Sequence, residues 1–444
     1  MLVGLKLLFL VAQGLALVGC TTANVKAPFV SDIPPTTMQR AVLSPPFSQD
    51  EALAAIEFCV DLDAQDDHFA NPGNPIYAMV PERIANWDKV YDSRVDLAAR
   101  RGLNPKDAAD PVSNGFGSFD SAWTLWKKKG ERAYIVALRG TVFKRGSSVV
   151  EDALASTVAA DDGVEFPAGR YVNLTFARLP RAEVHTGFAY GSFECVFDGT
   201  YGILKQLETN PLCSIPQGST VIFTGHSQGA GVATLTHAFF YYASLKEGDP
   251  FRIGARRLTL RSYVFAQPKP GNEQFSADFA GITRGGSTSF VFNNTIDAVP
   301  FLPPTHQFAF SAFEDCPQNN NVPGWPIIRG INNLANSVSS FFSRTIEKSV
   351  ASRVASMKAR GGDGIYLWDS GWLKRRDDHG TPAEAVSQNY SLAGTFVPLI
   401  GNLDGSSYFN NPDDARDPFI QHHSQVYRKL LEVIFEQPHL PTSS

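Results

Sequence analysis

Ser227 is the residue whose surroundings best suit a nucleophile. It lies in Gly-His-Ser-Gln-Gly, residues 225–229, after the β-branched and aromatic run 220–224 and before the apolar stretch 230–240. A strand that turns directly into a helix around Gly-x-Ser-x-Gly forms a nucleophile elbow, which exposes the serine hydroxyl. Glycine avoids a crowded Cβ in such a turn, and the helix N-terminus favours a developing anion. An incidental serine in a glycine-rich turn is the alternative, but the flanking runs favour attack by Ser227 on a carbonyl carbon.

An acid and a base must accompany such a serine, and triads built on this elbow follow the chain order Ser, Asp, His. Asp297 comes just after the apolar run 289–293, and open α/β sheets place their sites beyond the carboxyl ends of strands. Prolines at 300, 303 and 304 prevent a helix from starting there. We therefore expect Asp297 to orient the histidine, although a loop aspartate can also simply cap a turn.

The histidines that follow Asp297 are His306, His379, His422, His423 and His439. The first is very close in sequence to Asp297, the second lies in a charged turn, and the last lies in a proline-rich tail. The adjacent pair opens a helix with apolar residues at Val426, Leu430 and Ile434. Because the start of a packed helix holds an imidazole firmly, we expect the base to be one of this pair.

Two donors for a tetrahedral oxyanion can also be placed. One is the backbone N–H of Gln228, the residue after the nucleophile. The other is expected in the loop after an early strand, where the run 133–138 is followed by Arg139-Gly140-Thr141. Gly140 permits a close turn, and Thr141 offers both an N–H and a hydroxyl. Taken alone this is an ordinary strand end, so the role of Thr141 depends on the other motifs.

The elements that position these residues predict an α/β fold. Runs 119–126 and 133–138, separated by Lys-Lys-Lys-Gly, predict a hairpin. Later strands alternate with helices, which favours a mostly parallel central sheet with helices on both faces. We expect one domain of the α/β-hydrolase fold over residues 47–444, with a helical insertion at about 307–416. The later buried runs are 220–224, 258–265 and 289–293.

Within the insertion, residues 327–358 carry apolar side chains every three or four positions, which predicts an amphipathic helix. We favour a helix packed over the sheet, since amphipathic helices usually face a core. The alternative is a lid, or a face that lies on lipid. The apolar positions are Ile331, Leu334, Val338, Phe342, Ile346, Val350, Val354 and Met357.

Residues 1–19 have the composition of a signal peptide: one lysine, then an apolar run at 7–18 that is too short to span a bilayer. The segment ends in Leu-Val-Gly-Cys, which resembles the lipobox of bacterial lipoproteins. That resemblance implies that Cys20 becomes a lipid-carrying N-terminus and that residues 20–46 are a tether. The chain would then be exported and anchored to a membrane, the outer membrane in a Gram-negative host. A plain secretory signal is the alternative.

Composition argues against a nucleic-acid partner, because the net charge is −5 and no basic surface is indicated. We expect no metal or organic cofactor, since none of the remaining cysteines has the spacing of zinc ligands. In an oxidising compartment they could form two disulfides, with the pairing open. These cysteines are Cys59, Cys195, Cys213 and Cys316.

Together these motifs resemble the class 3 lipases, whose fold is that of the fungal triacylglycerol lipases. Five blocks in family order, over roughly residues 119–305, are far more specific than one elbow. They are ALRGT ending at Thr141, VHTGF from Val184, TGHSQGAG around Ser227, FAQPKPGN from Phe265 and NNTIDAVPFLPP around Asp297.

By that resemblance Ser227 is the nucleophile, Asp297 the acid, Thr141 the side-chain oxyanion residue and Gln228 the second N–H donor. The family histidine often precedes a tyrosine by three to five residues. Both His422 and His423 satisfy that spacing to the next tyrosine, and we favour His422 slightly. Two features depart from the family: alanine and glutamine follow Phe265, and the acid and the base are far apart.

The resemblance implies a carboxylic ester hydrolase that acts on an acylglycerol or a phospholipid. One alternative is an acyltransferase that uses the same triad. Another is a catalytically silent lipoprotein that binds lipid or a partner, since a fold alone does not fix a function.

Overall fold

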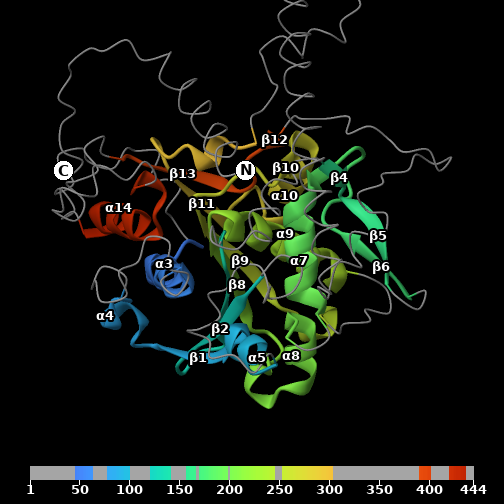
Figure 1. The fold of residues 1–444 in the computed structure, drawn as a ribbon, viewed down its shortest axis with the longest axis horizontal. Coiled ribbons are helices and arrows are strands. Elements are labelled where there is room, and N and C mark those ends of the chain that lie inside the picture. The colour runs from blue at the N-terminus through green and yellow to red at the C-terminus, as the bar shows by residue number, and fades with distance from the viewer. Residues whose placement is uncertain are drawn as a thin grey trace, which may run out of the picture.

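A twisted central sheet organises the computed structural model (Figure 1). The structure describes residues 46–63, 78–100, 121–141, 157–166, 170–198, 201–245, 253–303, 390–401 and 420–436. Among these residues seven strands form the central sheet in the order β1-β2-β3-β8-β9-β11-β13. The strands are β1 (Trp87–Asp92), β2 (Trp123–Lys128), β3 (Ala133–Leu138), β8 (Thr220–His226), β9 (Thr259–Phe265), β11 (Ser289–Asn294) and β13 (Thr395–Leu399).

The sheet is mostly parallel. Strands β3, β8, β9, β11 and β13 run parallel to their neighbours, whereas β1 and β2 join antiparallel at one edge. The expected hairpin is present as β2 and β3, which turn through Gly130 at a φ of 73°. Parallel strands are buried on both faces, and accordingly every residue of β3 and of β11 is buried. The predicted sheet is therefore confirmed.

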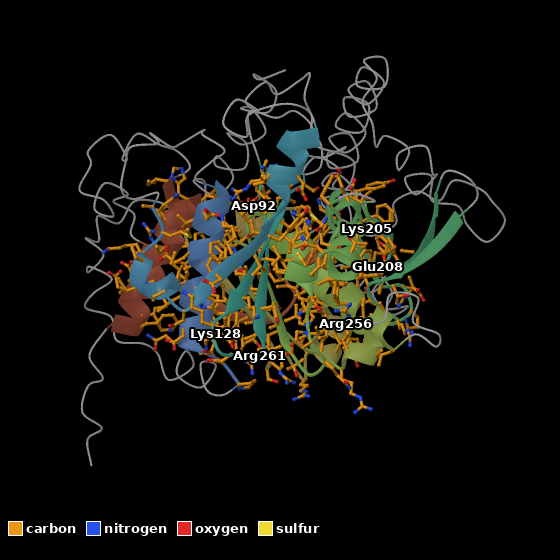
Figure 2. All side chains as sticks on the ribbon, turned by 90° about the horizontal axis from the view of Figure 1, so that it is seen from below. Asp92, Lys128, Lys205, Glu208, Arg256 and Arg261 are labelled. Carbon is orange, nitrogen blue, oxygen red and sulfur yellow. The ribbon has the colours of Figure 1, made fainter. Side chains whose placement is uncertain are left out.

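Helices cover both faces of the sheet (Figure 1). On one face lie α3 (Gln49–Asp63) and α14 (Ser424–Glu436); on the other lie α7 (Thr186–Phe197) and α9 (Gln228–Ser244). Figure 2 shows side chains filling the space between the sheet and these helices. Arg261, labelled there, joins β9 to α3 through an ion pair with Glu51 at 2.9 Å.

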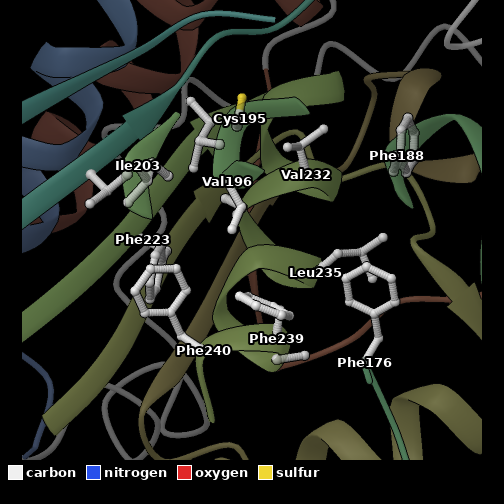
Figure 3. Packing of buried hydrophobic residues seen from close by; sticks show 14 of the residues in the cluster. Phe176, Phe188, Cys195, Val196, Ile203, Phe223, Val232, Leu235, Phe239 and Phe240 are labelled. Atoms are coloured by element: carbon white, nitrogen blue, oxygen red, sulfur yellow. The ribbon is translucent and has the colours of Figure 1, made fainter. Parts of the chain in front are cut away.

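Strand β3 shows why two separate cores form among the described residues. Its alternate residues Ala133, Ile135 and Ala137 face α3 and α14, whereas Tyr134, Val136 and Leu138 face α7 and α9. Successive side chains of a strand point to opposite faces, so one apolar strand supplies both cores. Figure 3 shows part of the second core, where Phe223 of β8 packs against Phe240 of α9 with ring centroids 5.1 Å apart.

Shorter elements surround this frame. A second sheet contains β12 (Tyr390–Ser391), β10 (Gly271–Asn272), β7 (Glu183–His185) and β4 (Thr157–Ala159), and β5 (Asp161–Phe166) pairs with β6 (Arg170–Thr175). The remaining α-helices of the described segments are α4 (Pro81–Ile84), α5 (Ser93–Arg100), α8 (Ile203–Thr209) and α10 (Glu273–Ile282). Four 3₁₀ turns are described: η3 (Pro211–Cys213), η4 (Gly254–Arg256), η5 (Val299–Phe301) and η9 (Ile420–His422).

The helical insertion expected at about 307–416 needs correction at residues 390–401, which contain strands β12 and β13. Strand β13 extends the central sheet by pairing in parallel with β11, Phe290 opposite Thr395 and Asn294 opposite Leu399. Its β-branched and aromatic residues suit a strand rather than a helix. The amphipathic stretch 327–358 lies outside the described residues.

Other expectations about the chain also lie partly outside the description. The signal segment, Cys20, most of the tether and Cys316 are not among the described residues. Within the described segments Cys59, Cys195 and Cys213 are buried. Those segments contain no helix long and apolar enough to cross a membrane, and no cluster of three acid, histidine or cysteine side chains that could hold a metal.

Candidate active site

The nucleophile elbow is formed where β8 passes into α9. Ser227 has φ 59° and ψ −131°, a backbone conformation that costs a non-glycine residue roughly 1–3 kcal/mol. The surrounding structure holds it there, since its N–H donates to the Phe265 carbonyl at 3.0 Å and its carbonyl accepts from the Ala230 N–H at 2.9 Å. The strained serine is therefore fixed between β9 and the first turn of α9.

Both glycines of the motif are required by close backbone approach. A Cβ on Gly225 would clash with the backbone of Gly229 one turn later. A Cβ on Gly229 would clash with the backbone at Leu138 and Arg139, where β3 ends. The glycines thus let strand, helix and neighbouring strand end meet around Ser227, as the sequence pattern predicts.

His422 links the serine to the acid. Its Nε2 lies 2.8 Å from the Ser227 hydroxyl, and its Nδ1 lies 2.7 Å from Oδ2 of Asp297. Because a carboxylate only accepts hydrogen bonds, Nδ1 carries the proton and Nε2 is left to accept from the hydroxyl. This is the tautomer that a general base needs.

Asp297 lies in the turn after β11 and is 1% exposed. Besides His422, the Tyr427 hydroxyl donates to Oδ2 at 2.7 Å, and the Val299 N–H donates to Oδ1 at 3.0 Å. The same tyrosine hydroxyl accepts from the Asn294 N–H at 3.1 Å. These donors stabilise a buried carboxylate that desolvation would otherwise penalise.

The two histidines of the predicted pair differ in position. His422 ends the 3₁₀ turn η9, and its ring points into the site. The carbonyl of the next residue, His423, accepts from the amides of Val426 at 2.9 Å and Tyr427 at 3.2 Å as α14 begins. The structure thus brings His422 to both Ser227 and Asp297. The other candidates, His306, His379 and His439, lie outside the described residues.

The loop after β3 lies against the elbow. A Cβ on Gly140 would stand 2.7 Å from the His226 carbonyl oxygen and 3.4 Å from Cβ of Ser227. Thr141 follows directly and is partly exposed, and Gln228 is the first residue of α9. Gln228 is thus at the N-terminus of α9, which favours negative charge, and Thr141 follows the glycine that lies against the elbow.

His185 occupies a different place. Its Nδ1 accepts from the Phe188 N–H at 3.3 Å and so caps α7. Burial lowers its pKa to about 3, so the ring is neutral near pH 7. His185 therefore has a structural role at the start of α7.

The two residues after Phe265 that depart from the family differ in what the structure explains. Ala266 adopts a left-handed φ of 51°. The Gln267 side chain donates to Thr234 at 2.7 Å and to the Ala393 carbonyl at 3.1 Å, and it accepts from the Ala393 N–H at 3.1 Å. Gln267 therefore ties the end of β9 to both the elbow helix and the segment before β13.

Sequence reasoning missed two side chains beside the triad. Tyr427 served only as a spacing marker, although a tyrosine five residues after His422 was the available signal. Asp63, the last residue of α3, contacts His226 at 3.2 Å, next to Ser227. No local pattern marks that contact, because it joins segments far apart in the chain.

Comparisons with known proteins agree with the sequence motifs. A family model described as Lipase (class 3) matches residues 135–307. Similar solved structures include a triacylglycerol lipase described as having a serine protease triad, with 16% identity, TM-score 0.33, and coverage of 60% of this chain and 75% of that one. The triacylglyceride lipase of Rhizomucor miehei has 17% identity, TM-score 0.33 and coverages of 58% and 76%. Lipase II from Rhizopus niveus has 16% identity, TM-score 0.32 and coverages of 58% and 75%.

The structural scores are low and do not assign roles to residues. The family match covers the part of the chain that holds Ser227 and Asp297, while His422 lies beyond it. The resemblance to the class 3 lipases is therefore confirmed over residues 135–307.

Proposed function

We propose that this chain hydrolyses carboxylic esters of lipids, with Ser227 as nucleophile, His422 as general base and acid, and Asp297 as the orienting carboxylate. The observation that carries the proposal is the continuous relay Ser227–His422–Asp297, with contacts of 2.8 and 2.7 Å. Nucleophilic serine catalysis needs this arrangement: a base within hydrogen-bond reach of the hydroxyl and a third group that orients the base.

The reaction begins when the Ser227 Oγ attacks the ester carbonyl carbon and His422 Nε2 takes its proton. His422 becomes an imidazolium, which Asp297 stabilises without itself being protonated. Collapse of the tetrahedral intermediate breaks the bond to the alkoxy oxygen, which leaves as the alcohol with the proton from Nε2. Water then attacks the acyl-enzyme with His422 as base again, so acid and free Ser227 are released.

The developing oxyanion is proposed to accept hydrogen bonds from the Gln228 N–H and from Thr141. The elbow supports this, because the α9 N-terminus and the loop at Gly140 both adjoin the Ser227 side chain. Each such donor typically contributes about 3 kcal/mol to transition-state stabilisation.

The substrate is proposed to be an acylglycerol or a phospholipid, which rests on the class 3 lipase match over residues 135–307. The test is to label the purified chain with a fluorophosphonate and to measure hydrolysis of a short-chain ester, a triacylglycerol and a phospholipid. Wild type should label and hydrolyse at least one lipid ester, whereas Ser227→Ala should do neither. Equal hydrolysis by the folded mutant would overturn the proposal, and ester formation with an added alcohol in place of free acid would indicate an acyltransferase.

We also propose that Cys20 is lipidated and anchors the enzyme to a membrane, on the strength of the Leu-Val-Gly-Cys sequence after a short apolar run. More than one acyl chain is needed for stable anchoring. Cell fractionation and intact masses of the full chain and of Cys20→Ser test this. Equal solubility of the two, without a lipid mass, would leave an ordinary secreted enzyme.

A further inference from the structure

The C-terminal end of α3 reaches the residue that precedes the nucleophile. Oδ2 of Asp63, the last residue of α3, lies 3.2 Å from Nδ1 of His226, the last residue of β8. The Asp63 side chain is 25% exposed and that of His226 is 6% exposed. Asp63 stands outside the segment that matches the class 3 lipase family.

The position of this acid is unfavourable for the helix itself. A carboxylate in the last turn opposes the helix dipole, and α3 has no basic residue in its last turn. The other acid of that turn, Asp61, is balanced by Lys89 at 2.7 Å and by Arg94 at 3.0 Å. Among the described residues, Asp63 makes its ion-pair contact with His226. The contact with His226 explains why Asp63 stands at the end of α3, where the helix dipole alone disfavours a negative charge.

The ring of His226 packs against two members of the proposed site. Its centroid lies 4.8 Å from that of His422 at an interplanar angle of 36°, and 5.5 Å from that of Tyr427 at 70°. Those two side chains are the ones that donate to Oδ2 of Asp297. A rotation of the His226 ring would therefore displace the base and one support of the acid together.

The orientation of that ring depends on Asp63. A carboxylate only accepts, so the Nδ1 of His226 that faces Asp63 at 3.2 Å carries the proton. The opposite nitrogen, Nε2, is buried and has no hydrogen-bond partner among the described residues. Among the described residues, the contact with Asp63 is thus the polar interaction that selects the tautomer and the rotamer of His226.

We propose that Asp63 and His226 are positioning residues for the reaction: Asp63 fixes the His226 ring, and the ring holds His422 in line with Ser227. This inference rests on the proposed function, because it assumes that His422 is the base. It also makes the N-terminal helix α3 a part of the active site rather than only a cover for the sheet.

The test uses the full chain and a soluble short-chain ester, at a temperature well below every variant's Tm. Asp63→Ala should lower kcat by about tenfold with KM within about twofold, less than the ~10²-fold that a 1 Å misplacement can cause. Asp63→Asn should restore most of the rate, since its amide oxygen accepts from the same Nδ1. Asp61→Asn is the matched control, because Asp61 lies on the same turn of α3 as Asp63. It weakens the contacts of Asp61 with Lys89 of β1 and Arg94 of α5 and should leave kcat unchanged.

A double-mutant cycle tests whether Asp63 acts through His226. In a His226→Phe background, which keeps an aromatic ring but removes Nδ1–H, Asp63→Ala should cause no further loss of kcat. Wild-type kcat in Asp63→Ala, or an equal loss in Asp63→Asn, would overturn the inference. Ser227→Ala in the same assay separates the two claims: an active Ser227→Ala removes the proposed function, whereas an inactive one with a normal Asp63→Ala removes only the positioning role.

Discussion

The two faces of the central sheet treat buried histidines in opposite ways. On the α7 and α9 face, His185 and His237 contact the aromatic rings of Phe188 and Phe223 respectively. Burial lowers the pKa of each to about 3, so both are neutral. On the α3 and α14 face, His226 and His422 each contact a carboxylate, Asp63 or Asp297.

The difference lies in what each buried imidazole contacts, an aromatic ring or a carboxylate. Desolvation alone disfavours an imidazolium, whereas a nearby carboxylate favours it. The proposed mechanism needs a transient imidazolium at His422, and that residue lies on the face where an acid is supplied. The same face holds buried pairs between acids and arginines, such as Glu57 with Arg83 at 2.9 Å and with Arg428 at 3.2 Å. The residues of the proposed mechanism thus lie on the face where buried histidines contact acids.

The strongest test of this comparison is the pair His422→Ala and His423→Ala. Loss of the base should lower kcat by roughly 10⁴–10⁶-fold, as for triad residues elsewhere. His423→Ala keeps the backbone carbonyl that begins α14 and should change kcat by less than about threefold. Steady-state kinetics on a soluble ester, with circular dichroism to check folding, measures both. Similar losses in the two variants would contradict the geometric distinction between them.

Part of this site could be predicted because its signals are local. Gly225, Ser227 and Gly229 stand between a strand pattern and a helix pattern, and each glycine meets a backbone close to it in space. Asp297 was placed from the strand that precedes it. The sequence also placed Gln228 after the nucleophile and Thr141 just after the end of β3, and their oxyanion role stays a prediction. These features depend on short stretches whose geometry the residue types largely dictate.

The remaining features depend on contacts between distant segments. The choice between His422 and His423 depends on which ring points towards Ser227 at the junction of η9 and α14. Sequence spacing does not predict the direction of a ring. The contact of Asp63 with His226 and the pairing of β13 with β11 also join residues far apart in the chain. The residue types of β13 favour a strand. Its place in the sheet depends on pairing with β11, a segment far away in the chain.

A second test concerns the face that keeps its histidines neutral. His237 binds protons more weakly in the folded chain than in the unfolded chain, because burial lowers its pKa from 6.5 to about 3. As pH falls below about 6.5 the unfolded state gains a proton that the folded state does not, so stability declines towards pH 3. For this residue the free energy of unfolding should fall by about 1.4 kcal/mol per pH unit between about pH 6 and pH 4.

Urea unfolding at several pH values measures that slope. His237→Phe should flatten it by about 1.4 kcal/mol per pH unit, although the variant loses the bond between Nδ1 and the Ser262 hydroxyl at 3.1 Å. Ser262→Ala is the control, because it removes the same bond and retains the titrating ring. An unchanged slope in His237→Phe would show that this face does not hold the histidine neutral.

The smallest expected effect compares two tyrosines on the face of the sheet that α3 and α14 cover. Two buried tyrosine hydroxyls there donate to carboxylates: Tyr427 to Asp297 at 2.7 Å and Tyr263 to Glu51 at 2.8 Å. Replacing either with phenylalanine removes one hydrogen bond, worth about 1 kcal/mol.

Of the two carboxylates, only Asp297 contacts the base, so Tyr427→Phe should lower kcat by about tenfold, a loss of about 1.4 kcal/mol, with KM unchanged. Tyr263→Phe should lower Tm and leave kcat within about twofold, since Arg261 still pairs with Glu51. Steady-state kinetics and thermal unfolding of both variants measure these effects. If kcat falls in proportion to Tm in both variants, Tyr427 stabilises the fold and does not position Asp297.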